Sequence, residues 1–141
     1  MDKDLILSEE KGEIVLYQPN DNIRLEVRLQ DETVWLTQQQ MAELFNTTRN
    51  NITLHIGNIF KEGELEVNSV RKESLLTALD GKKYRTKFYN LDVIISVGYR
   101  VKSKVGTRFR QWANAVLLQI IYKNIYYVRE KNYLPVSGSH E

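Results

Sequence analysis

The sequence of 141 residues contains no cysteine, only two prolines and only two histidines. Without thiols the chain cannot build a disulfide, a cysteine-ligated zinc site, an iron–sulfur centre or a thiol nucleophile. His55 and His140 are too few for a histidine metal cage, and a Ser-His-Asp triad lacks its parts as well. We therefore expect no enzyme, no cofactor, no metal site and no small-molecule substrate.

Long hydrophobic runs are also missing. The apolar segment after Ala113 is interrupted by Gln119, Lys123 and Asn124, which predicts no membrane span. The N-terminus has no basic region followed by an apolar stretch, so we expect no signal peptide and a cytoplasmic protein. The composition, 42% hydrophobic and 27% charged, is typical of one globular domain. We place that domain at residues 13–134, between a flexible N-terminus (1–12) and a disordered tail (135–141).

The net charge of +2 conceals a strong asymmetry along the chain. Residues 1–69 carry 6 Lys/Arg and 13 Asp/Glu, a net of −7, whereas residues 70–112 carry 11 Lys/Arg and 3 Asp/Glu, a net of +8. The remaining residues carry +1. A basic block of this size indicates a polyanionic partner, although mutual neutralisation of the two halves within the fold is the alternative.

The first half of the domain shows the period-two pattern of β-strands. Residues 13–17 form a β-branched apolar run, and residues 19–22 supply turn chemistry. Residues 23–30 then alternate strictly between apolar and polar, which predicts a half-buried strand. A short strand at residues 33–36 completes a small antiparallel sheet.

At Thr37 the pattern becomes helical. Thr37 and Gln40 have the spacing of a capping box, and Leu36 and Met41 that of a hydrophobic staple, which predicts a helix at 38–45. A second helix is expected at 48–61, capped by Thr48 and closed by a glycine at 63. Its buried stripe comprises Ile52, Ile56, Ile59 and Phe60.

Two short helices joined by a tight turn are typical of a helix-turn-helix. Ala42 supplies the small residue that lets the second helix cross closely over the first. Asn46 stands where the turn usually has glycine, and asparagine tolerates the left-handed conformation. Thr47 replaces an aliphatic residue, and the last apolar site falls on Ile56 rather than His55. Two packed helices without a nucleic-acid role remain the alternative.

Further elements follow in the basic block. Residues 75–79 and 82–89 around Asp80-Gly81 predict a β-hairpin with a two-residue turn. Residues 91–99 are read as a helix capped by Asn90, and a last helix is expected from Gly106 or Thr107. Beyond Tyr122 the pattern fits a helix or a strand equally well. The side chains expected in the core from the last helix are Phe109, Trp112, Ala113, Val116, Leu117, Ile120 and Ile121.

The outward face of the second helix is the candidate base-reading surface. Arginine can bridge two atoms of guanine, asparagine can pair with adenine, and Thr or Leu methyl groups can contact thymine. The candidate base contacts are Arg49, Asn50, Asn51, Thr53 and Leu54, with His55 beside them. For Asn51, capping of the first helical turn is an equally good explanation.

Basic residues downstream of the helix pair are candidates for phosphate contacts. Four lie on the hairpin, where a winged helix-turn-helix carries its wing, and a second group surrounds the start of the last helix. With Thr48, the candidate backbone contacts are Lys82, Lys83, Arg85, Lys87, Arg100, Lys102, Lys104 and Arg108; Arg110 lies in the same cluster. A solvated helix face is the alternative for the second group. Glu62, Glu64 and Glu66 could bind Mg²⁺ but are better explained as solvated charges.

The residues also resemble a known family. The run TVWLTQQQMAELFNTTRNNITLHIGNIFKEGEL, the segment SVRKES and the block KYRTKFYNLDVIISVGYRVKSKVGTRFRQWA are similar to the RhuM family, virulence-associated proteins of pathogenicity islands and mobile elements. The resemblance extends from about Gly12 to Ala113, and it implies a helix-turn-helix DNA-binding module without established enzyme activity. After Ala113 the sequence departs from the family pattern, which suggests a truncated copy or a fragment.

We therefore expect an α+β fold: a winged helix-turn-helix with a small N-terminal antiparallel sheet and C-terminal helices. The expected function is binding of double-stranded DNA and regulation of transcription on a mobile element or pathogenicity island. The alternative is a protein-interaction or adaptor module whose basic surface binds an acidic partner. The aromatic end of the chain, which includes Tyr122, Tyr126, Tyr127 and Tyr133, could form a homodimer contact or pack within its own domain.

Overall fold

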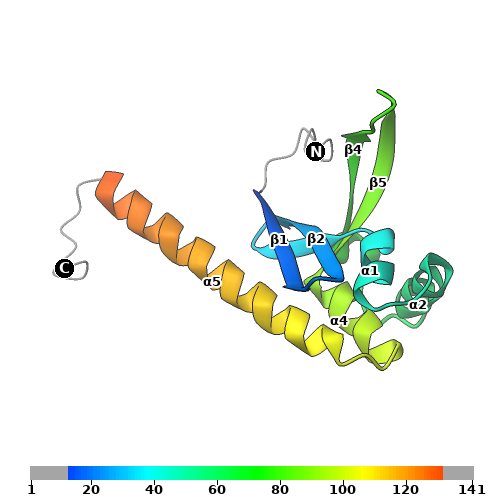
Figure 1. The fold of residues 1–141 in the computed structure, drawn as a ribbon. Coiled ribbons are helices and arrows are strands. Elements are labelled where there is room, and N and C mark those ends of the chain that lie inside the picture. The colour runs from blue at the N-terminus through cyan, green and yellow to red at the C-terminus, as the bar shows by residue number, and fades with distance from the viewer. Residues whose placement is uncertain (1–12, 132–141) are drawn as a thin grey trace.

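The computed structural model describes residues 13–131, with side chains described as far as Gln119. The expected flexible N-terminus (1–12) and disordered tail (135–141) lie outside the described residues. An α+β fold is confirmed (Figure 1). Its elements are β1 (Glu13–Asn20), β2 (Ile23–Gln30), β3 (Thr33–Leu36), α1 (Gln38–Leu44), α2 (Arg49–Lys61), α3 (Val67–Val70), β4 (Arg71–Thr77), β5 (Lys83–Asn90), α4 (Leu91–Arg100) and α5 (Val105–Lys131).

The five described strands form a single antiparallel sheet in the order β1-β2-β3-β5-β4. The sequence predicts a small N-terminal sheet and a hairpin but does not predict that they pair, and in the structure they belong to one sheet. The junction is a short pairing of β3 with β5, in which Trp35 lies opposite Asn90 and Leu36 opposite Tyr89. This pairing fixes the base of the β4–β5 hairpin beside the helix pair, while its far end projects from the body (Figure 1).

The tip of that hairpin differs from the predicted two-residue turn. Strand pairing ends at Thr77 opposite Lys83, so five residues connect the strands. The amide of Gly81 donates to the carbonyl of Ala78 at 2.9 Å, and Gly81 has φ +84. A turn followed by a glycine in the left-handed region is a standard hairpin solution, and it places Asp80-Gly81 at the tip as expected.

Between β2 and β3 the two-residue turn lies at Asp31 and Glu32, which both have positive φ, 55° and 61°. Two consecutive residues in that region are the signature of the turn that matches the twist of paired strands. The turn thus sets the register in which Gln30 faces Thr33.

The helix pair forms as predicted at its boundaries. The Thr37 hydroxyl accepts from the amide of Gln40 at 3.1 Å, and the Gln40 side chain accepts from the amide of Thr37 at 2.9 Å. The capping box is therefore complete, and it starts α1 at Gln38. Asn46 adopts φ 55, the left-handed conformation that asparagine tolerates and that the turn requires. The N-terminal cap of α2 is Thr48, as expected.

The main core lies between one face of the sheet and the helices. Leu36 and Met41, the predicted staple pair, are both fully buried, as is the predicted stripe of α2 at Ile52 and Ile59. Phe45 packs against Gly98 of α4, where a Cβ would approach its ring to 3.3 Å. This close approach joins the helix pair to the C-terminal helices.

The last helix settles the ambiguity that the sequence leaves beyond Tyr122. It starts at Val105, one residue earlier than expected, and continues as a helix to Lys131. Phe109 and Ala113 are fully buried, and Trp112, Val116 and Leu117 are partly buried against the core. The side chains of Ile120 and Ile121, also expected in the core, lie outside the described residues.

Candidate nucleic-acid interface

The outward face of α2 presents polar side chains to solvent. Arg49, Asn50, Thr53 and Leu54 are exposed, Leu54 to 59%, while the opposite face of the helix is buried in the core. The first two turns of α2 contribute these side chains. This arrangement is the one expected of a helix that reads bases from its N-terminal half.

Asn51 behaves differently from its neighbours. Its side-chain Nδ2 donates to the Thr47 hydroxyl at 2.9 Å, and its backbone amide donates to the Thr48 hydroxyl at 3.1 Å. Both interactions stabilise the turn and the start of α2, which favours the capping explanation for Asn51. The hydroxyl oxygen of Thr48 is likewise occupied by the cap of α2. Arg49 and Asn50 are exposed and take no part in these capping contacts, whereas the Thr53 hydroxyl donates to the carbonyl of Arg49 at 3.0 Å.

Two glutamines of α1 adjoin this face, and the sequence analysis did not select them. Gln38 Oε1 lies 3.5 Å from the Thr53 hydroxyl, and Gln38 Nε2 lies 3.5 Å from the hydroxyl of Tyr89 on β5. Gln39 is exposed beside it. The signal in the sequence is their position directly after the Thr37 cap, because the first turn of a helix has backbone N–H groups without intrahelical partners and is a common place for ligand contacts.

The structure brings the exposed face of α2 and the hairpin together in one groove of about 580 Å³. Arg49 and Thr53 come from α2, and Arg85 and Lys87 come from β5, more than 30 positions later in the chain. The full lining is Thr37, Gln38, Gln39, Arg49, Thr53, Leu76, Arg85, Thr86 and Lys87. Three cations and several amide or hydroxyl groups thus converge on a single open cleft.

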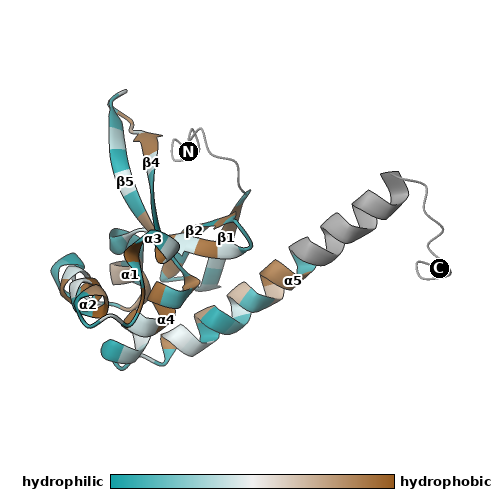
Figure 2. Cartoon of the chain, turned by 180° about the vertical axis from the view of Figure 1, so that it is seen from behind, coloured by the Kyte–Doolittle hydropathy of each residue, from teal (hydrophilic) through white to brown (hydrophobic). Residues whose placement is uncertain are grey.

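The basic side chains of the hairpin follow the pleat of β5. Lys83, Arg85 and Lys87 occupy alternate positions and so share one face of the strand. All three are exposed, and β5 is largely hydrophilic along its length (Figure 2). Arg85 forms an ion pair with Glu73 across the hairpin at 3.5 Å, with 71% of the Arg85 side chain exposed. An exposed pair of this kind is weak and leaves the arginine available to a phosphate.

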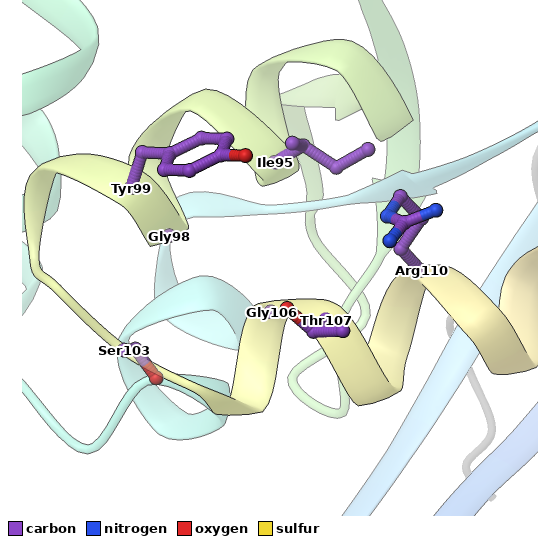
Figure 3. A pocket seen from close by; sticks show the side chains of 7 residues that line it. All are labelled: Ile95, Gly98, Tyr99, Ser103, Gly106, Thr107 and Arg110. Carbon is purple, nitrogen blue, oxygen red and sulfur yellow. The ribbon is translucent and has the colours of Figure 1, made fainter.

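The second predicted basic cluster is elsewhere, around the α4–α5 turn. Its members Lys102, Lys104, Arg108 and Arg110 are exposed, but none of them lines the groove. Arg110 instead borders a pocket of about 50 Å³ between α4 and the first turns of α5 (Figure 3). The pocket is also lined by Ile95, Gly98, Tyr99, Ser103, Gly106 and Thr107. Its volume is too small for a nucleotide.

Arg100 does not fit its predicted role as a phosphate contact. Its guanidinium donates to Glu62 at 2.9 Å and to Glu64 at 2.8 Å, so two carboxylates already neutralise its charge. The Ser96 hydroxyl donates to Glu64 at 2.6 Å. This network also explains the carboxylate cluster, because Glu62 and Glu64 hold the end of α2 against α4 rather than presenting oxygens to Mg²⁺. We leave Arg100 out of the interface.

These contacts predict an acid-dependent loss of stability. Hydrogen bonds from Arg100 lower the pKa of Glu62, and those from Ser96 and Arg100 lower the pKa of Glu64, below the ordinary value of 4.5. A lowered carboxyl pKa stabilises the fold at neutral pH, and this contribution disappears as the pH falls through the folded-state pKa. We expect Arg100→Gln to unfold at lower urea concentration than wild type at pH 7 and to converge with it below pH 4.5. A constant difference between the two urea midpoints at every pH would contradict this assignment.

Within residues 13–131 no group of three or more His, Asp or Glu side chains could hold a metal ion. The helices of the same range are all too short or too polar to cross a lipid bilayer. The homodimer contact predicted for the tyrosines after residue 121 falls on side chains outside the described part of the chain, so it stays a prediction.

Fold and groove together define the class of protein: an α+β domain in which a capped helix pair adjoins a basic antiparallel hairpin. Residues 69–134, a little under half of the chain, match the virulence protein RhuM family. The family predicted from the sequence is thereby confirmed for this segment, whereas residues 12–68 of the predicted resemblance, which include the helix pair, lie outside the match. The matched segment starts at α3 and continues past Ala113, so the predicted departure from the family at that residue is wrong. No curated protein and no solved structure matches the chain.

Proposed function

We propose that this protein binds double-stranded DNA through the groove between α2 and the β4–β5 hairpin. The supporting observation is the groove itself, which places Arg49 and Thr53 beside Arg85 and Lys87. Arginine and hydroxyl side chains on an exposed helix suit base edges in the major groove, and a row of cations on the adjacent strand suits the phosphate backbone. Regulation of transcription on a mobile element is the biological role that this activity would serve.

In this proposal the interface has two kinds of contact. The N-terminal half of α2 enters the major groove, where Arg49 and Asn50 reach base edges. Lys83, Arg85 and Lys87 follow the phosphates of the same duplex, since alternate residues on a strand point to the same side. The glutamines at the start of α1 border the groove and supply additional hydrogen-bond donors to it. Base contacts specify the sequence, and phosphate contacts provide most of the affinity.

The first test measures binding to a short random duplex by fluorescence anisotropy at two salt concentrations. Wild type should bind at about 50 mM salt with a Kd in the micromolar range, and the affinity should fall steeply as salt is raised. A polyglutamate of similar charge serves as the competitor for the alternative function. The absence of duplex binding at low salt would refute DNA binding. Equal competition by polyglutamate would show that the surface does not prefer DNA and would favour an adaptor for acidic partners.

The second test concerns base reading and needs a duplex obtained by selection from random sequences. We expect Arg49→Ala to reduce the preference for the selected site over random duplex by about 10-fold or more, with the salt dependence changed little. Arg24→Ala, which removes the same side chain from an exposed position of β2 outside the groove lining, is the matched control. If Arg49→Ala weakens all duplexes equally, α2 contributes only charge, and the major-groove assignment is lost.

A further inference from the structure

The connection between β4 and β5 carries an exposed leucine at the end of the projecting hairpin. Leu79 is 93% exposed, more than any other large hydrophobic side chain in the described part of the molecule. The hairpin extends well beyond the body of the domain, and its tip is the most distant part of the sheet (Figure 1). Single exposed hydrophobic residues are common on protein surfaces, so exposure alone assigns no role. A role is indicated by the turn that contains Leu79 and by the cations beside it.

The tip is a built turn. The amide of Gly81 donates to the carbonyl of Ala78, and the amide of Ala78 donates to the carbonyl of Lys82, both at 2.9 Å. The Asp80 carboxylate accepts from the Lys82 amide at 2.9 Å and from the Tyr84 hydroxyl at 2.8 Å, and these bonds lower the pKa of Asp80. Hydrogen bonds therefore fix the backbone of the turn on both sides of Leu79. A backbone that is already fixed lowers the entropic cost of binding through the exposed leucine.

Cations lead from the groove to this tip. Lys82 and Lys83 are exposed directly after the turn, and Arg85 and Lys87 continue the row along β5 to the groove. If α2 lies in the major groove of a duplex, the next part of the hairpin that the same duplex can contact is the tip. There the apolar side chain of Leu79 is flanked by Lys82 and Lys83.

An apolar side chain flanked by cations on a narrow projecting element has a known physical use on DNA. Proteins that enter the minor groove contact it with Arg or Lys and insert an apolar wedge between base pairs, which unstacks the step and kinks the duplex. We propose that the hairpin tip enters the minor groove beside the α2 site and that Leu79 inserts between two base pairs and bends the DNA. This inference rests on the proposed function, since it needs the duplex to be held by the groove.

Bending is measured directly by energy transfer between two dyes at the ends of a duplex that carries the selected site. On addition of saturating wild-type protein, the transfer efficiency should rise because the ends approach. Leu79→Ala should still bind, with Kd weakened by about tenfold at most, but the transfer efficiency should stay near that of the free duplex. Leu16→Ala is the matched control, a leucine 41% exposed on β1 at the opposite end of the sheet order, and should bend the duplex like wild type.

The outcomes separate the two proposals. If wild type fails to bind the duplex, DNA binding itself is refuted. If wild type binds without a change in energy transfer, or if Leu79→Ala bends the duplex as wild type does, DNA binding stands and the wedge is refuted. Because Leu79 is exposed and makes no core contact, loss of folding does not explain a loss of bending, and circular dichroism of the variant checks this.

Discussion

Replacing Lys83, Arg85 and Lys87 together with glutamine will weaken binding to every duplex by about 500-fold at 0.1 M salt, if each cation neutralises one phosphate. The reason is counterion release. Each phosphate contact contributes about −0.9 to the slope of log K against log salt, so the triple variant should lose about 2.7 of that slope. The preference for the selected site should change little, because these side chains do not reach base edges.

The matched control for this prediction is the triple variant Lys102→Gln, Lys104→Gln and Arg108→Gln. It removes the same charge from exposed positions, but from the α4–α5 turn rather than from the hairpin. We expect it to retain most of the salt slope. An equal loss in both triple variants would mean that the duplex responds to the overall charge of the domain. A loss confined to the second variant would move the phosphate contacts to the start of α5.

The local features of the fold could be predicted because each is determined by residues close together in the sequence. The capping box at Thr37, the asparagine turn at Asn46 and the Asn90 cap of α4 all have the predicted geometry. A cap or a turn needs only hydrogen bonds across three or four residues, so its residue types are informative on their own. The single sheet was missed because its β3–β5 junction joins segments about 50 residues apart.

Tertiary contacts explain the other errors. Strict alternation in β2 places Arg28 on the solvent side, yet Arg28 is only 5% exposed. Its guanidinium lies 4.4 Å from the centre of the Phe88 ring and donates to the Ser74 hydroxyl at 3.0 Å. Phe88 and Ser74 belong to the hairpin, so the burial follows from strand order, which periodicity does not report. Arg100 is similar: its carboxylate partners stand 36 and 38 residues away.

The candidate site could likewise be predicted only in part, because its local features follow from the sequence and their convergence does not. The exposed face of α2 follows from its period of 3.6, and the exposed row on β5 follows from its period of two. That both rows line one groove depends on the β3–β5 pairing, and the two glutamines of α1 enter the groove for the same reason. Composition therefore predicts a surface that suits a polyanion, whereas only the fold shows which basic side chains converge on one groove.

The largest expected effect on stability comes from Phe109. It is fully buried, with its ring 5.1 Å from Tyr17 in an edge-on contact and 5.6 Å from Trp112. Tyr17 and Trp112 also contact each other, with ring centroids 4.8 Å apart. This aromatic cluster is where α5 packs on β1, so removing the Phe109 ring leaves a cavity at that contact. We expect Phe109→Ala to lower the free energy of unfolding by about 3–5 kcal/mol.

A loss of that size is a large part of the 5–15 kcal/mol that is ordinary for a domain. Urea unfolding followed by circular dichroism measures it, with Leu118→Ala as the control on the same helix. Leu118 is 67% exposed, so its truncation should change the free energy of unfolding by less than about 0.5 kcal/mol. A similar small effect for Phe109→Ala would show that α5 does not depend on this contact. Because Phe109 lies outside the groove, the fraction of Phe109→Ala that remains folded should bind the duplex with the wild-type Kd, which separates the role of α5 in stability from recognition of DNA.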